Sequence, residues 1–177
     1  IAPVHAGSAT GCDLVGWKFP DRCTWNADAG GAPIYLVGDS NADHLSEAVI
    51  AAANELSRPV VNVTSSGCAP LQSLSTVRPV GASVTSEDCA IASRGATRFL
   101  DRADPGLVIF SNSYWQYLFT DRLKFKYSQG LNETDPQAKL DALSSALTAT
   151  IRCFEDQGHK GLLVQTIPSW GERSPLR

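Results

Sequence analysis

The chain has 177 residues, of which 43% are hydrophobic and 19% charged, and its formal net charge is −3. This length suits one domain with a substantial core, and the absence of a basic run argues against a nucleic-acid partner. The apolar runs are strand-sized, which excludes a membrane span, and the first residues do not have the pattern of a signal peptide. The start at Ile1 and the absence of methionine predict an excised piece of a longer protein.

Residues 1–32 have no regular hydrophobic period, whereas residues 33–177 alternate strand and helix patterns. We therefore expect an irregular, disulfide-stapled lead-in segment over 1–32 and one α/β domain over 33–177. Strands that alternate with helices favour a mostly parallel sheet in a three-layer α/β/α sandwich. No helical pattern follows the last strand, so we expect the fold to lack its final elements and to expose an apolar flank there. The expected strands are Ile34–Val37, Val60–Val63, Leu107–Phe110 and Gly161–Thr166, and the expected helices are Ala42–Leu56, Glu87–Asp101 and one from Asp135-Pro136 to Gly158, with an aromatic-rich insertion over 112–135.

The five cysteines are too scattered for a zinc site, because the chain has no Cys-x-x-Cys pair and only three histidines. Cys12 and Cys23 bracket a short loop, and Cys68 and Cys89 bracket a longer one. The disulfides Cys12–Cys23 and Cys68–Cys89 are expected as loop staples of an exported protein, with buried free thiols as the alternative. Cys153 is then left over, either as a buried thiol or with a partner outside this chain.

The turn Gly38-Asp39-Ser40 follows the first buried strand and precedes a helical pattern. Gly38 permits a close backbone turn, and Asp39 is a good N-cap. This turn would bring Ser40 to the carboxyl edge of the sheet, at a helix start whose N–H groups favour an anion. Ser40 is therefore a candidate nucleophile, although the tripeptide alone more often marks an ordinary capped helix start.

Two other strands end in residues that suit the same chemistry. The second strand runs into a loop that contains Gly67, and the third runs into Asn112. A glycine N–H and an asparagine amide beside a serine are the donors that stabilise the oxyanion in acyl transfer. We expect the Ser40 hydroxyl, the Gly67 N–H and the Asn112 side chain to converge on one pocket, with the Ser40 N–H as a third donor.

These residues resemble the motifs of the SGNH (GDSL-like) hydrolase superfamily, whose namesake Ser, Gly and Asn match Ser40, Gly67 and Asn112. The stretches Gly-Asp-Ser-Asn-Ala-Asp-His-Leu and Ser-Gly-Cys-Ala-Pro-Leu are similar to the extracytoplasmic SGNH domain fused to bacterial membrane O-acyltransferases. The resemblance covers roughly residues 33–170 and implies a flavodoxin-like fold with a serine nucleophile.

The chain departs from the family pattern at three places. Phe110 and Ser113 replace the usual Gly and Asp around the asparagine, and Asn41 stands where the subgroup often has histidine. No Asp-x-x-His block follows the last strand, so Ser40 has no recognisable general base. We expect that block, one more strand and a partner for Cys153 in a segment beyond Arg177.

None of the three histidines of this chain is a clear substitute for the general base that the Asp-x-x-His block would supply. His44 shares a helical face with Ser40, but a structural contact near the helix start is the favoured interpretation. His159 is expected on the surface at the opposite edge of the sheet, and His5 lies in the irregular segment without an assignable role.

The insertion 112–135 leaves the sheet at the edge that carries Asn112. Its residues Tyr114, Trp115 and Tyr117 are candidates to line an acyl or sugar pocket, with packing onto the core as the alternative of equal weight. The Asn-x-Thr sequons at Asn62 and Asn132 are weak matches, and the first falls within a strand.

The function predicted first is an O-acyltransferase or acetylesterase that moves an acyl group to or from hydroxyls of a cell-surface glycan or glycolipid through a Ser40 acyl-enzyme. The resemblance implies an acyl donor relayed by a membrane domain of the same polypeptide, an extracytoplasmic location, and neither metal nor organic cofactor. An inactive SGNH-like module that binds glycan or docks on its membrane partner is the alternative. A flavodoxin-like phosphate or flavin binder is disfavoured, because Asp39-Ser40-Asn41 is not a dense phosphate loop.

Overall fold

The computed structural model describes residues 12, 23–78, 80–119, 124–127 and 135–165. Its elements in chain order are β1 (Thr24–Trp25), β2 (Ile34–Gly38), α2 (Ser40–Asp43), α3 (Ser46–Glu55), β3 (Val60–Thr64), β4 (Leu74–Val77), α4 (Ser86–Leu100), β5 (Leu107–Ser111), α5 (Tyr114–Phe119), β6 (Lys124–Tyr127), α6 (Pro136–Asp156) and β7 (Lys160–Val164).

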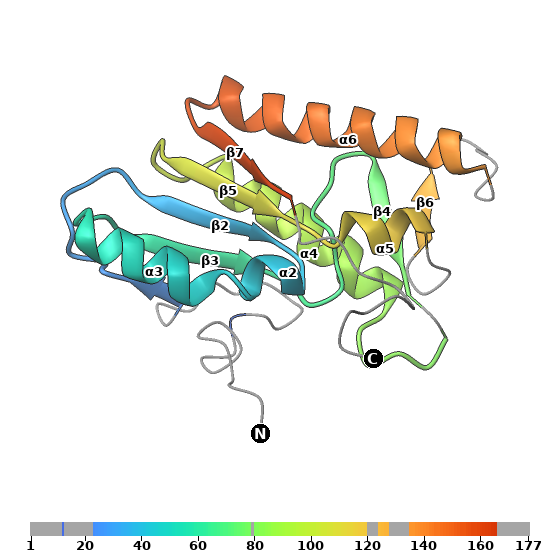
Figure 1. The fold of residues 1–177 in the computed structure, drawn as a ribbon, viewed down its shortest axis with the longest axis horizontal. Helices are drawn as coiled ribbons and strands as arrows, with labels where there is room; N and C mark the ends of the chain where they lie inside the picture. The colour runs from blue at the N-terminus through green and yellow to red at the C-terminus, as the bar shows by residue number, and fades with distance from the viewer. Residues whose placement is uncertain (1–11, 13–22, 79, 120–123, 128–134, 166–177) are drawn as a thin grey trace, which may run out of the picture.

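The main sheet has five strands in the order β1-β3-β2-β5-β7 (Figure 1). The pairs β2–β3, β2–β5 and β5–β7 are parallel, and only the short edge strand β1 runs antiparallel, against β3. All five residues of the central strand β2 are buried, as expected of a parallel strand covered on both faces. The expected α/β class and mostly parallel sheet are confirmed.

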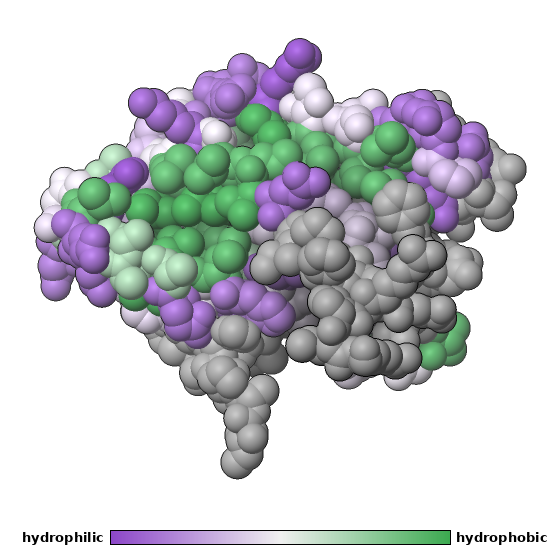
Figure 2. All heavy atoms as spheres, viewed as in Figure 1, coloured by the Kyte–Doolittle hydropathy of each residue, from purple (hydrophilic) through white to green (hydrophobic). Residues whose placement is uncertain are grey.

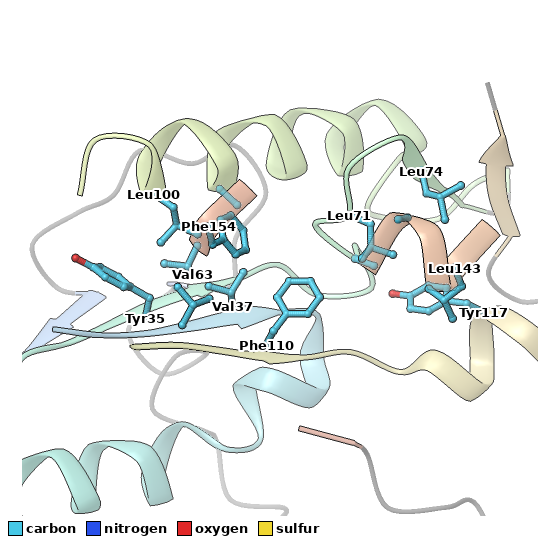
Figure 3. Packing of buried hydrophobic residues seen from close by; sticks show 14 residues of the cluster. Tyr35, Val37, Val63, Leu71, Leu74, Leu100, Phe110, Tyr117, Leu143 and Phe154 are labelled. Carbon is cyan, nitrogen blue, oxygen red and sulfur yellow. The ribbon is translucent and has the colours of Figure 1, made fainter. Parts of the chain in front are cut away.

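Helices cover the two faces of the sheet and complete the three layers (Figure 1). One face of β2 and β5 packs with residues of α4 and α6 in the larger core cluster, which Figure 3 shows from close by. The opposite face packs with α2 and α3 in a smaller cluster. Side chains that alternate along β2 therefore enter different layers, as the strand geometry requires. The larger cluster includes Tyr35, Val37, Phe110, Leu100, Leu143 and Phe154, and the smaller one includes Ile34, Leu36, Ile109, Ala42 and Ala53.

Two local features differ from the expected elements. The helix expected over 42–56 is divided into α2 and α3, because the Leu45 N–H bonds to the Ala42 carbonyl three residues earlier and tightens the turn. The aromatic-rich insertion forms α5 and β6, and β6 pairs antiparallel with β4 in a separate two-stranded sheet. This small sheet joins the insertion to the segment that follows Gly67.

The edge strand β7 carries an exposed apolar surface. Leu162 and Leu163 are 47% and 48% exposed, and Figure 2 shows a continuous hydrophobic area over the part of the sheet that contains β5 and β7. The apolar flank expected beside the fourth predicted strand is therefore present. Among the described residues, no helix has the length and hydropathy needed to cross a bilayer.

The sequence interpretation of His159 as a surface residue is wrong. His159 is 3% exposed and packs edge-on against the Tyr35 ring, with centroids 5.4 Å apart. Its Nδ1 accepts a hydrogen bond from the Gly106 N–H at 3.1 Å, and its Nε2 lies 3.1 Å from the Leu100 carbonyl oxygen. The buried imidazole pairs with two backbone groups, one at the end of α4 and one directly before β5.

Replacing His159 with alanine should leave the Gly106 N–H without its partner, whereas the Leu100 carbonyl still accepts the Ala103 N–H. An unpaired donor of this kind costs about 1–3 kcal/mol, so we expect the free energy of unfolding to fall by roughly 1–3 kcal/mol in urea denaturation. The matched control is His44→Ala at an exposed position, which should change the value by no more than about 0.5 kcal/mol. Equal small effects in both variants would show that the buried imidazole has no structural role.

Candidate active site

The candidate site lies where the parallel strands end at one level. In the register of the sheet, Gly38 pairs with Thr64 on β3 and with Ser111 on β5. The residues that follow these three positions therefore leave the sheet at the same edge. Ser40, Gly67 and Asn112 all belong to these segments, as the sequence predicted from the order of strands and loops.

Gly38 allows the β2 chain to turn at this edge. Its φ is +153°, and a Cβ there would overlap the Ser111 carbonyl group of the neighbouring strand. Only glycine permits this close approach of two backbones. Asp39 then caps α2, because its carboxylate accepts the Asn41 N–H at 2.8 Å. Ser40, the first residue of α2, is half-buried.

The Asp39 carboxylate is the centre of the hydrogen-bond network at this edge. It is 1% exposed. One oxygen accepts from the Asn41 N–H and from the Asn41 amide at 3.1 Å. The other accepts from the Ser113 N–H and from the Tyr117 hydroxyl, each at 2.8 Å. All four groups are donors, so this buried carboxylate is fully satisfied and fixes the turn that carries Ser40.

Asn112 is completely buried and is tied to the same turn. Its Oδ1 accepts the Asp39 N–H at 3.0 Å, and its Nδ2 is 3.4 Å from the Tyr114 hydroxyl. This pattern fixes the orientation of the amide, because Oδ1 must face the backbone donor. The Asn112 side chain therefore lies beside the residue that precedes Ser40, with its NH₂ group oriented away from the Asp39 N–H.

The loop that contains Gly67 is attached to the end of β2. The Ser65 N–H donates to the Gly38 carbonyl at 2.9 Å, and the Cys68 N–H donates to the Ser65 carbonyl at 3.0 Å. Gly67 has a φ of +68°, and a Cβ there would collide with the guanidinium of Arg78. The positive φ favours glycine at this position, and the absence of a side chain leaves room for the Arg78 guanidinium.

Both expected disulfides form in the structure. Cys12 and Cys23 have their Cα atoms 5.5 Å apart, and Cys68 and Cys89 have theirs 4.9 Å apart. The second bridge joins the residue after Gly67 to α4. Cys153 is a free thiol.

The three aromatic residues proposed as pocket lining occupy different environments. Tyr114 and Trp115 are half-buried. Tyr117 is 1% exposed and belongs to the larger core cluster, beside Leu71 and Leu143 (Figure 3). The structure thus places Tyr117 in the interior, where its hydroxyl donates to the Asp39 carboxylate and does not face an open surface.

Burial also changes the acidity of two of these phenols. It raises the pKa of Tyr114 above its usual value, and the nearby negative charge of Asp39 adds to the shift. The pKa of Tyr117 is raised well above the ordinary value by complete burial and then by Asp39. Both hydroxyls therefore remain protonated near neutral pH, and Tyr117 remains a hydrogen-bond donor.

Neither described histidine is an evident base for Ser40. His44 is exposed at the end of α2. Asp156-Gln157-Gly158-His159 has Asp-x-x-His spacing, but His159 precedes β7 and uses both ring nitrogens in the interior. The register pairs Lys160 with Leu107, the first residue of β5, so this motif lies at the edge opposite Ser40. No group of three or more potential metal ligands occurs among the described residues.

Comparison with protein families identifies the chain. A family model described as "SGNH domain (fused to AT3 domains)" matches residues 8–177. The chain belongs to this family. Comparisons with curated proteins and with solved structures gave no match. The sandwich described above is consistent with the flavodoxin-like fold of SGNH domains, and fusion to acyltransferase domains is a property of the family.

Sequence reasoning missed two residues of this SGNH domain that support the Gly67 loop. Arg78 donates to the Gly67 carbonyl at 3.4 Å, and the Thr76 hydroxyl accepts the Ala69 N–H at 3.1 Å. Both residues lie on or just after β4, a four-residue strand. The alternation Leu74, Thr76 with Ser75, Val77 was the available signal, but it is too short to separate a strand from a loop.

The buried phenols should make stability fall at alkaline pH. Their folded-state pKa is raised, so their contribution to stability is complete below the unfolded value of about 10 and is lost as the pH rises above it. We expect the free energy of unfolding to decrease by up to about 1.4 kcal/mol per pH unit for each tyrosine. Tyr114→Phe should flatten this decrease in urea titrations between about pH 9 and about pH 11. If the free energy of unfolding of Tyr114→Phe depended on pH as steeply as that of the parent chain, the raised pKa of Tyr114 would be contradicted.

Removal of the Cys68–Cys89 bridge should loosen the loop that contains Gly67. For a bridge with a sequence separation of 21 residues, the double variant Cys68→Ala/Cys89→Ala should lose about 3 kcal/mol of unfolding free energy. Amide exchange over 65–71 should accelerate as well. The control pair Cys12→Ala/Cys23→Ala should lower stability without accelerating exchange in that loop, and identical exchange in both variants would argue against a specific role.

Proposed function

We propose that this SGNH domain transfers an acyl group, and most simply an acetyl group, to or from hydroxyls of a cell-surface glycan or glycolipid. The observation that carries the proposal is that β2, β3 and β5 end at the same level of the sheet. The segments that contain Ser40, Gly67 and Asn112 therefore start at one edge. Membership of a family fused to acyltransferase domains supports the same reaction class. The two disulfides support an extracytoplasmic location.

In the proposed reaction, the Ser40 hydroxyl attacks the acyl carbonyl carbon and loses its proton to a general base. The negative charge that develops on the carbonyl oxygen is stabilised by the N–H groups of Ser40 and Gly67 and by the Asn112 amide. Collapse of this intermediate expels the donor alkoxide, which takes up a proton. A sugar hydroxyl, or water in an esterase, then attacks the acyl-enzyme and releases Ser40.

The acyl donor is expected to reach this domain from a membrane acyltransferase domain of the same polypeptide. The general base is the component that the described residues do not supply clearly. An exposed His44, at the end of α2, is the nearest histidine in sequence to Ser40. The reaction therefore predicts slow acylation that an added base accelerates, since a general base contributes about 10²–10⁴ in rate.

The test is incubation of the chain with p-nitrophenyl acetate, followed by intact-mass measurement and peptide mapping. One acetyl group should appear on Ser40, slowly without a base and roughly 10²-fold faster with added imidazole. Ser40→Ala should abolish the label, whereas the exposed hydroxyl control Ser66→Ala should not change it.

Two outcomes would decide between the rival interpretations. If His44 is the base, the parent chain should acylate rapidly without imidazole and His44→Ala should acylate slowly. If Ser40 remains unlabelled in the presence of imidazole, the acyl-enzyme mechanism is overturned and the inactive glycan-binding or docking module becomes the better interpretation.

A further inference from the structure

An open groove lies between α4 and the segment that leads into β4, outside the candidate active site. Its volume is about 690 Å³, within the range of sites that bind small ligands. Leu71, Leu74 and Ala90 form its apolar part, and the two leucines also belong to the larger core cluster (Figure 3). The other described lining residues supply two guanidinium groups, several hydroxyl groups and one amide, and none of them is acidic.

The two walls of the groove are tied to each other and to the rest of the fold. The Ser93 hydroxyl on α4 donates to the Leu71 carbonyl on the opposite wall at 3.3 Å. The next residue on that wall, Gln72, donates its N–H to the Thr150 hydroxyl on α6 at 2.9 Å. A groove held in this way is already formed before a ligand binds, so little conformational entropy is lost on binding.

Two hydroxyl oxygens of α4 are left as hydrogen-bond acceptors in this groove. The Ser93 hydroxyl proton is used by the Leu71 carbonyl, and the Thr97 hydroxyl proton is used by the Ser93 carbonyl at 3.2 Å. Carbonyl oxygens only accept, so both hydroxyls must be the donors in these two bonds. Any further partner of the two oxygens must bring its own proton, as the hydroxyl group of a sugar does and an ionised carboxylate does not.

Two arginines on the same helix supply the positive charge of the groove. Arg94 and Arg98 are exposed and four residues apart, so they lie one turn apart on one face of α4. Arg94 pairs with Glu87 at 3.4 Å, but both side chains are more than half exposed and such a pair is weak in water. Within the described part of the chain, Arg98 has no ion pair. A guanidinium binds a carboxylate through two parallel N–H bonds, so these arginines suit an acidic ligand.

We propose that this groove binds an acidic glycan. The carboxylates of its sugars contact Arg94 and Arg98, and sugar hydroxyls donate to the oxygens of Ser93 and Thr97. The combination of guanidinium donors with hydroxyl acceptors on one helix face favours a ligand that carries both carboxylates and hydroxyls over a simple anion.

The position of the groove relates it to the candidate active site. On α4 its lining begins at Ala90. The preceding residue, Cys89, forms the disulfide to Cys68, directly after Gly67. From Ala90 to Arg98 the helix rises about 12 Å. The groove therefore holds an acidic part of the acceptor beside the Gly67 loop, and this second statement, unlike binding itself, rests on the proposed function.

Binding is tested by titration calorimetry with hexagalacturonate, an acidic oligosaccharide, and with maltohexaose, a neutral one of equal length. The parent chain should bind the acidic sugar at least about tenfold more tightly. Arg94→Gln and Arg98→Gln should each weaken that binding by about tenfold. Arg102→Gln is the matched control, because it removes the same charge from an exposed arginine that is not among the described lining residues. Its affinity should stay within about twofold of the parent value.

A second variant tests the class of ligand. Thr97→Val removes the acceptor oxygen and keeps the shape, so it should weaken hexagalacturonate binding by about threefold or more and leave the binding of inorganic phosphate unchanged. Thr148→Val, at an exposed position of α6, is its control. Equal losses in Arg98→Gln and Arg102→Gln would overturn the site. Phosphate affinity as high as that for hexagalacturonate, or binding to vesicles of anionic lipid without binding to the sugar, would overturn the ligand class.

The role toward the reaction is tested on chain that carries the acetyl label on Ser40, after excess ester is removed. Hexagalacturonate should accelerate loss of the label roughly tenfold more than maltohexaose does, because binding raises the local concentration of its hydroxyls. Arg98→Gln should abolish this difference, and Arg102→Gln should keep it. Tight binding without faster loss of the label would overturn the acceptor role. If Ser40 takes no label, the proposed function fails, whereas calorimetry still decides whether the groove binds an acidic glycan.

Discussion

The structure at the carboxyl edge of the sheet depends on one buried carboxylate. Asp39 is 1% exposed, and a charge removed from water costs several kcal/mol unless hydrogen bonds replace its hydration. Its four donors come from Asn41 on α2, from Ser113 after β5 and from Tyr117 on α5. The loss of any of these hydrogen bonds would raise the free energy of the buried carboxylate. The folded chain is therefore restricted to conformations in which the ends of β2 and β5 and the helix α5 meet at Asp39.

This constraint explains why a short insertion helix matters to a site formed by strand ends. The sheet alone sets the level at which β2, β3 and β5 end, through the register that pairs Gly38 with Thr64 and Ser111. It does not set how the segments beyond those ends lie relative to one another. The Asp39 carboxylate adds that information, since it joins the start of α2 to Ser113 after β5 and to Tyr117 on α5.

The sequence was sufficient for the features that follow from local pattern and from the geometry of parallel sheets. The apolar runs, the Gly38-Asp39-Ser40 turn and the spacing of cysteines led to the four parallel strands, to their carboxyl edge and to both disulfides, but not to β1 or β6. Sequence reasoning failed where the hydrogen-bond partners of a residue are distant in the chain, or where a strand is too short to show a hydrophobic period. His159 was misplaced because its partners, the Gly106 N–H and the Leu100 carbonyl, lie 53 and 59 residues away, and β4 was missed because four residues carry little periodicity.

Asn112 shows how the same network orients a buried amide side chain. Its Oδ1 is held by the Asp39 N–H, so the amide cannot turn without leaving two buried groups unpaired. The orientation of its NH₂ group is therefore a consequence of backbone hydrogen bonding one residue before Ser40. In the proposed reaction this NH₂ group, which lies 3.4 Å from the Tyr114 hydroxyl, is the donor assigned to the carbonyl oxygen, and preorganised amides are effective in acyl transfer. The interaction that buries Asp39 and the interaction that orients Asn112 thus belong to one turn, and a change in either is expected to alter both.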